Sequence, residues 1–136
     1  MAGEQAIFIV IFIGVLFLIA ASNRKTRAKA AVSLSEATDK VNELRQKVLV
    51  VSSTAIPGKE IKQVLGQLSG TSSIEASRPE EADAAEQQAM LNLMEKAQAM
   101  GANAVIDAKL TSSSHQKQGS KWMVSKAYYT GTAVII

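Results

Sequence analysis

A long apolar run near the N-terminus constrains this chain more than any other feature. Residues 6–21 read AIFIVIFIGVLFLIAA, sixteen residues without a charged or strongly polar side chain. A helix of that length spans about 24 Å, and Gln5, Ser22 and Asn23 can extend it toward the roughly 30 Å of a hydrocarbon core. We therefore expect a transmembrane helix at residues 5–23.

The charges around this run predict how it is oriented. Arg24, Lys25, Arg27 and Lys29 follow it, with no acidic residue between positions 24 and 29. A cleaved signal peptide, the alternative, carries its positive charge before the apolar run. Basic flanks stay on the cytoplasmic side and favour anionic headgroups. We expect a single-pass protein of the bacterial inner (cytoplasmic) membrane, with its N-terminus outside, its C-terminal domain in the cytoplasm and the lipid bilayer as a partner.

Composition excludes several classes of protein. The 136 residues allow one modest domain besides the anchor. Without the four flanking cations and Glu4, the chain has 11 basic and 11 acidic residues, so a globally basic nucleic-acid binder is excluded and nucleic acid is not an expected partner. The chain has no cysteine, which excludes disulfide scaffolds, zinc ribbons and thiol catalysis.

Residues 24–47 are predicted to form a basic flank and a helical stalk. Apolar residues recur at spacings of 3, 4, 3 and 4, a two-heptad pattern typical of a coiled coil, and Ser33 with Glu36 resembles a capping box at its start. The seam consists of Leu34, Ala37, Val41, Leu44 and Val48. Copies of the stalk are expected to bundle. The alternative is a single amphipathic helix packed on its own domain or on the bilayer surface.

The remaining residues, 48–136, read as one α+β domain. Strands are expected at 48–54 and 61–69, joined through a turn with Pro57 and Gly58 at its centre. A helix is expected from Ser77, its N-cap in a capping box with Glu80, to a stop at Gly101. Its expected apolar stripe consists of Ala82, Ala85, Ala89, Leu93, Ala97 and Met100, widened by Met90 and Met94.

The C-terminal third completes the expected fold. Alternating residues predict a strand at 104–110, followed by a polar loop at 111–121 and a final strand or strand pair at 122–136 that contains Gly131. The order is β-β-α-β-β, with one long helix on an antiparallel-rich sheet. Few aromatic residues and an alanine-rich helix make a thin core. An apolar last strand would also be an exposed edge. Both features predict a homo-oligomer.

Several short motifs resemble the YbjQ family, whose label names heavy-metal binding. They are residues 56–61 (IPGKEI), 64–66 (VLG), 69–70 (SG), 100–105 (MGANAV) and 131–134 (GTAV). The resemblance covers about residues 48–136 and implies a small α+β subunit assembled into a ring, usually a pentamer. More distantly, residues 66–70 and 102–105 are similar to the RcsF stress-sensor fold. The anchor and stalk are additions to the family's usual architecture.

Residues able to carry chemistry are few. The label points to metal, but methionines at helical spacing are typical core residues, and His115 in a polar loop is only a weak candidate ligand. The serines at 112–114 beside His115 lack an orienting third group and an oxyanion site. Asp107 is expected in a cross-strand charge pair. No catalytic residue, metal site or cofactor is predicted, and the protein is not expected to be an enzyme.

These observations lead to one functional hypothesis and two alternatives. The chain is expected to be a membrane-anchored, ring-forming scaffold or binding module that acts without catalysis, with itself and an unknown protein as partners. The first alternative is a metal-binding or metal-responsive protein. The second is an envelope stress sensor with its domain on the outer side of the membrane.

Overall fold

The chain divides into two compact units. The structure, a computed structural model, describes the backbone of residues 2–136 and the side chains of residues 15–136 other than 17, 23, 25–27, 30 and 33. The first unit is Met1–Val32 and the second, called the core unit below, is Ser33–Ile136.

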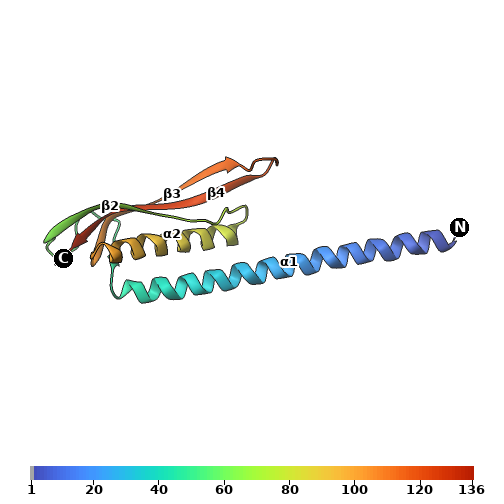
Figure 1. Cartoon of the computed structure of the whole chain (residues 1–136), viewed down its shortest axis with the longest axis horizontal. Helices are drawn as coiled ribbons and strands as arrows, with labels where there is room; N and C mark the ends of the chain where they lie inside the picture. The colour runs from blue at the N-terminus through green and yellow to red at the C-terminus, as the bar shows by residue number, and fades with distance from the viewer. Residues whose placement is uncertain (1) are drawn as a thin grey trace. The chain divides into compact units, whose positions relative to one another are not determined.

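One continuous helix, α1 (Ala2–Arg45), carries both the predicted span and the predicted stalk (Figure 1). It passes through Ser33 instead of starting there, because residues 24–32 (RKTRAKAAV) are mostly good helix formers. Much of the apolar run, at 6–14 and 17, has side chains outside the described residues. Among the residues that are described, no helix is long and apolar enough to cross a membrane. The span at 5–23 stays a prediction.

The core unit is a mixed α+β fold, as the sequence predicts. Its other elements are β1 (Leu49–Val50), β2 (Gln63–Thr71), α2 (Pro79–Ala99), β3 (Ala104–Gln116) and β4 (Met123–Ile135). They form a sheet of order β1-β3-β4-β2, in which β1 is parallel to β3 and the other neighbours are antiparallel. The predicted β-β-α-β-β order is confirmed, and α2 covers one face of the sheet (Figure 1).

The strands differ from the prediction in length. Strand β1 ends at Val50, because Asp107 forms a bulge in β3 that shifts the register, and its N–H donates to the Ser53 carbonyl at 3.0 Å. Strand β3 continues to Gln116, so the predicted loop at 111–121 was wrong. Its polar residues pair across β4: the hydroxyls of Ser114 and Ser125 lie 2.7 Å apart.

The start of α2 also differs from the expected capping box. Arg78 is the N-cap and makes no side-chain cap. Glu81, not Glu80, reaches back, accepting hydrogen bonds from the Ser77 N–H at 2.8 Å and the Ser77 hydroxyl at 2.9 Å. The backbone donor of Ser77 is the main cause that lowers the pKa of Glu81.

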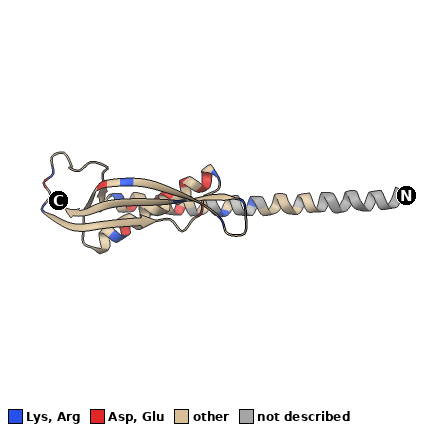
Figure 2. Cartoon of the chain, turned by 90° about the horizontal axis from the view of Figure 1, so that it is seen from above, with Lys and Arg blue, Asp and Glu red and all other residues tan. Residues whose placement is uncertain are grey.

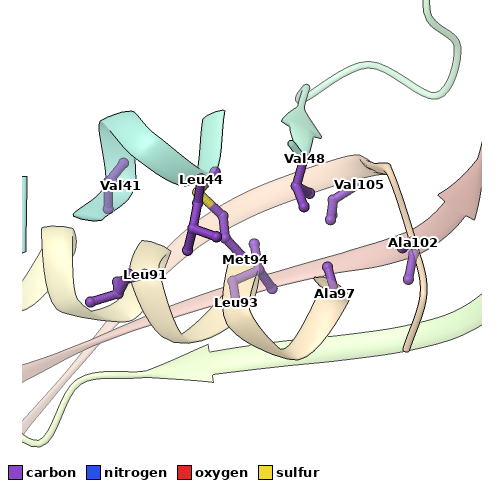
Figure 3. Close-up of a cluster of buried hydrophobic side chains, with 10 residues drawn as sticks. Val41, Leu44, Val48, Leu91, Leu93, Met94, Ala97, Ala102 and Val105 are labelled. Atoms are coloured by element: carbon purple, nitrogen blue, oxygen red, sulfur yellow. The ribbon is translucent and has the colours of Figure 1, made fainter. Parts of the chain in front are cut away.

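The main hydrophobic core lies where α1, α2 and the sheet meet (Figure 3). Val41, Leu44 and Val48, three of the five seam residues, are buried there, so this part of the seam is occupied within the chain. Leu34 and Ala37 are half-buried. The packing corresponds to the alternative in which the helix rests on its own domain.

Helix α2 is buried on a wider face than a single stripe. Leu91 and Ala84 are buried in addition to the expected residues, because α1 covers one side of α2 while the sheet covers another. Met100 is exposed, since it is the C-cap. On the opposite face of the sheet, Ile56 of the 51–62 loop packs on a second cluster that includes Ile106.

Candidate functional site

The sheet face opposite α2 carries an open, polar depression of about 650 Å³. Its polar lining comes from β2, β3 and β4, at positions brought side by side by the strand register. These residues are Gln67, Ser69, Asp107, Lys109, Thr130 and Thr132.

Asp107 gives this depression its one carboxylate. It sits at the bulge with φ +53°, a left-handed conformation that Asp tolerates better than most residues. The bulge takes Asp107 out of the regular pairing, and it forms no ion pair with the described side chains, so the expected cross-strand pair was wrong. A single carboxylate, one lysine and several hydroxyls can hydrogen-bond a small polar molecule. They provide no nucleophile with a paired base.

His115 lies on β3, not in the loop that the sequence predicted. Its Nε2 is 3.5 Å from Oε1 of Glu75, and Lys126 Nζ is 3.8 Å from the same oxygen. Glu75 reaches the sheet because the next residue, Ala76, forms a β-bridge with Ser125. No local spacing in the sequence joins positions 75 and 115, so sequence reasoning missed this partner.

These residues do not fit a metal ion within one copy of the chain. His115 and Glu75 give two ligands, and the ammonium of Lys126 competes for the same oxygen. No group of three His, Cys, Asp or Glu side chains occurs among the described residues. Met94 is fully buried in the core, and Met90 packs against it.

The outer edge of β3 is open over residues 109–116. Strand β1 pairs only with Ala104 and Val105, and no other described strand runs along this edge. On β4, the backbone groups of Ser125 and Ala127 point toward the 72–76 segment. The Ser125 N–H donates to the Ala76 carbonyl, and the Ser72 N–H donates to the Ala127 carbonyl.

This arrangement fixes which backbone groups of β3 face outward. Ser112 and Ser114 are the partners of Ala127 and Ser125 on β4. Because those two β4 residues bond to the other side, the pairs with β3 are of the non-hydrogen-bonded kind. The N–H and C=O groups of Ser112 and Ser114 therefore point away from the sheet.

The outer edge of β2 is partly closed. Asn92 Nδ2 donates to the Thr71 carbonyl at 2.7 Å, and Lys96 Nζ donates to the Ser69 carbonyl at 2.6 Å. Two side chains of α2 thus occupy outward acceptors of β2, one of the ways in which proteins protect a sheet edge. Among the described strands, β3 presents the longer unprotected edge.

The other residues singled out in the sequence have simple structural positions. Pro57 and Gly58 form the centre of a turn closed by the Lys59 N–H donating to the Ile56 carbonyl at 3.1 Å, with Gly58 at φ +74°. Arg24 and Lys29 are exposed, whereas Lys25 and Arg27 have side chains outside the described residues. Figure 2 colours the basic and acidic residues that are described along the chain.

The same part of the chain carries the open edge, the bulge and the His115 cluster, and it is the part with a family match. Residues 75–136 match the YbjQ family model, described as "Putative heavy-metal-binding". The motifs at 100–105 and 131–134 lie inside this span, and those at 56–70 lie outside it.

A solved structure also resembles this chain. It is a protein of unknown function from Pediococcus pentosaceus ATCC 25745, described as a member of the DUF74 family. The two are 19% identical with a TM-score of 0.48, over 65% of this chain and 97% of the other. No curated protein matches the chain.

Proposed function

We propose that this protein is a membrane-anchored scaffold or binding module whose copies assemble into a ring through the open edge of β3. The observation that carries this proposal is the outward direction of the Ser112 and Ser114 backbone groups. An unpaired strand edge is a template for pairing with another chain. The described side chains offer no nucleophile with a paired base that would favour an enzyme over this proposal.

The two edges of the sheet differ, which favours a closed ring over a simple dimer. Strand β3 is open over 109–116, and Leu110 on it is 41% exposed. Strand β2 lies at the other edge, where Val64 is 62% exposed. Side chains of α2 occupy the Ser69 and Thr71 carbonyls, so a contact with the β2 edge has to use the part around Val64. A contact between unlike edges is head-to-tail, and head-to-tail contacts produce rings when the rotation closes. The ring that the YbjQ resemblance implies, usually a pentamer, has this kind of symmetry.

Two variants of Ser112 test the assembly. Ser112→Pro removes an outward N–H that the subunit's own sheet does not use, so the fold should tolerate it while edge pairing is lost. Ser112→Ala keeps the N–H and serves as the matched control. Native mass spectrometry of the full chain in lipid nanodiscs should show a defined oligomer for wild type and S112A, and mostly monomer for S112P. An unchanged oligomer in S112P would contradict the β3 edge as the contact.

Membrane attachment is supported by the apolar run at 6–21 and the cations that follow it. Because the chain has no cysteine, single cysteines can report topology cleanly. Gln118→Cys on the exposed hairpin and Ala2→Cys near the N-terminus form a matched pair. In intact spheroplasts an impermeant maleimide should label the Ala2 variant and not the Gln118 variant. The opposite pattern would favour the stress-sensor alternative, with the domain outside the cytoplasm.

The metal-binding alternative is favoured by the family description and by the His115–Glu75 pair. The described side chains of one copy supply too few ligands, so this alternative needs ligands from a second copy. Native mass spectra recorded after addition of Zn²⁺ would then show a metal-sized excess proportional to subunit number, and His115→Ala would remove it. We expect no specific excess.

A further inference from the structure

We infer that the tip of the β3–β4 hairpin docks on the surface of an anionic bilayer, as a second contact besides the anchor. The hairpin tip is residues 116–123, with sequence QKQGSKWM. This inference rests on the membrane attachment proposed above and adds a lipid-binding surface in the core unit.

The hairpin tip exposes two large apolar side chains at consecutive positions of the chain. Trp122 is 70% exposed and Met123 58%, and Trp122 is the most exposed large hydrophobic residue described in the core unit. It is also the single tryptophan of the chain. Exposed apolar residues that lie together mark interaction surfaces, and tryptophan is enriched at the level of lipid headgroups.

The charges of the hairpin tip fit anionic headgroups. Lys117 and Lys121 flank the turn, and residues 116–123 include no acidic side chain. In the described part of the chain, neither lysine takes part in an ion pair. Basic residues near the surface of an anionic membrane are attracted to it, and apolar neighbours add burial.

The fold places the hairpin tip at the end of the core unit where the chain enters. Val41 of α1 lies beside Leu91 of α2 (Figure 3). Val48, which follows the end of α1, lies near Val105 at the start of β3. The last turns of α1 thus run parallel to α2. Strand β3 runs the opposite way to α2, so Ser33 and the hairpin tip lie toward the same end.

Lengths along the chain agree with this placement. From Val105 to the tip, β3 extends about 40 Å at 3.3 Å per residue. From Val48 back to Ser33, the chain covers roughly 22 Å, mostly as helix. Both segments therefore extend from the same end of the core unit toward the end that carries the hairpin tip.

A second copy of this chain could also cover Trp122 and Met123. The lysines favour lipid, because anionic headgroups at the bilayer surface can balance both charges while Trp122 lies at the level of the headgroups. The experiment below separates the two occupants.

Trp122 itself is the probe. The full chain is reconstituted into vesicles of phosphatidylcholine, with or without about 30% phosphatidylglycerol. Tryptophan fluorescence is then recorded in vesicles whose lipids carry brominated acyl chains, which quench it. In anionic vesicles we expect blue-shifted emission, protection from acrylamide and at least about twofold quenching by the bromolipid. The pure phosphatidylcholine vesicles should show a weaker effect.

Two double variants test the role of charge. Lys117→Gln with Lys121→Gln should reduce bromolipid quenching in anionic vesicles toward the level seen without phosphatidylglycerol. Lys59→Gln with Lys62→Gln is the matched control, because it removes two exposed lysines near the C-terminal end of β4, where Lys62 N–H donates to the Ile135 carbonyl. The control should quench like wild type.

The outcomes separate this inference from the anchor. If the chain floats with the vesicles and resists alkaline extraction but Trp122 stays fully accessible to acrylamide, the anchor stands and the lipid contact of the tip is overturned. If Trp122 is shielded but not quenched by bromolipid, a second copy covers it and the inference is also overturned. If the chain does not float with vesicles, the membrane attachment fails first, and this inference with it.

Discussion

At the residue scale, two glycines permit close packing in the core unit because they have no side chain. A Cβ on Gly70 would collide with the backbone of α2 at Ala89 and Leu93, so strand β2 and helix α2 approach each other closely only with glycine there. A Cβ on Gly131 would lie 2.5 Å from Cγ1 of Val105. The sequence placed Gly131 in the last strand and Gly70 in a short motif that resembles a known family. It could not tell which contact each glycine serves.

These contacts predict a ranked loss of stability. Gly70→Ala should destabilise the fold by about 3 kcal/mol or more, because backbone atoms of a packed helix would have to move. Gly131→Ala should cost less, roughly 1–3 kcal/mol, because its one severe contact is with a side-chain methyl of Val105 and not with the backbone of a packed helix. Urea denaturation of the full chain in detergent measures both. Equal losses for the two variants would contradict the ranking, and Ser112→Ala, which is exposed, provides the baseline.

A second prediction at this scale concerns pH. The hydrogen bonds from Ser77 lower the pKa of Glu81 below the ordinary value of a glutamate in the folded state. A group with a lowered folded pKa contributes stability above its unfolded pKa, and that contribution is lost as pH falls through the folded value. Glu81 is largely solvated, so the contribution is small, about 0.5 kcal/mol after allowance for solvent screening.

Glu81→Gln should therefore lower stability at pH 7 and make little difference well below pH 4 (about the pKa of a solvated carboxyl). Glu80→Gln is the neighbouring control, because Glu80 makes no hydrogen bond to Ser77 among the described contacts. Thermal unfolding between acidic and neutral pH measures the difference. A constant difference between wild type and E81Q at all pH values would contradict the role of the Ser77 bonds.

At the scale of elements, the periodicity of the sequence predicted the positions of the helices and strands well. It predicted the contacts between them less well. The order of the domain's elements and the stripe around Ala89 and Leu93 follow from spacing and turn residues alone. The length of β3 did not, because a run of serines has weak strand preference and is held in place by pairing with β4. The partners of His115 also depend on chain segments that are distant in sequence.

The heptad seam is a pattern that is compatible with two different packing partners. The spacing of Val41, Leu44 and Val48 suits a neighbouring helix, and the spacing is the same whether that helix belongs to another copy or to α2. The structure uses these three residues inside the core unit. Leu34 and Ala37 remain half-buried, so any contact between copies of α1 in this segment has to use them.

This assignment predicts the effect of shortening Leu44. Leu44→Ala should destabilise the core unit by about 2–4 kcal/mol, because the side chain is buried against α2. Gln46→Ala, on an exposed position near the end of α1, is the control and should change little. Urea denaturation checks both. If L44A kept full stability and instead lost oligomers, the seam would be an intermolecular one.

At the scale of the whole molecule, the sequence and the structure describe complementary parts. The apolar run and its basic flank can be identified from the sequence alone, whereas most of their side chains lie outside the described residues. The open edge of β3 and the exposed hairpin tip, in contrast, need the sheet register and could not be found from spacing. A single subunit with a thin core, one protected edge and one open edge has unused pairing capacity, which is the physical basis for expecting assembly.

Assembly through that edge couples stability to concentration. A protomer that is stabilised by its neighbours has an apparent unfolding midpoint that rises with protein concentration, because binding to the folded state shifts the equilibrium by mass action. Wild type and Ser112→Ala, measured in detergent over a hundredfold range (about two decades) of concentration, should show this rise, whereas Ser112→Pro should have a constant midpoint. A midpoint that is independent of concentration in wild type would mean that the β3 edge contributes nothing to folding stability. Parallel midpoints in wild type and S112P, both rising with concentration, would place the intermolecular contact on another surface, with the half-buried α1 residues Leu34 and Ala37 as the next to replace.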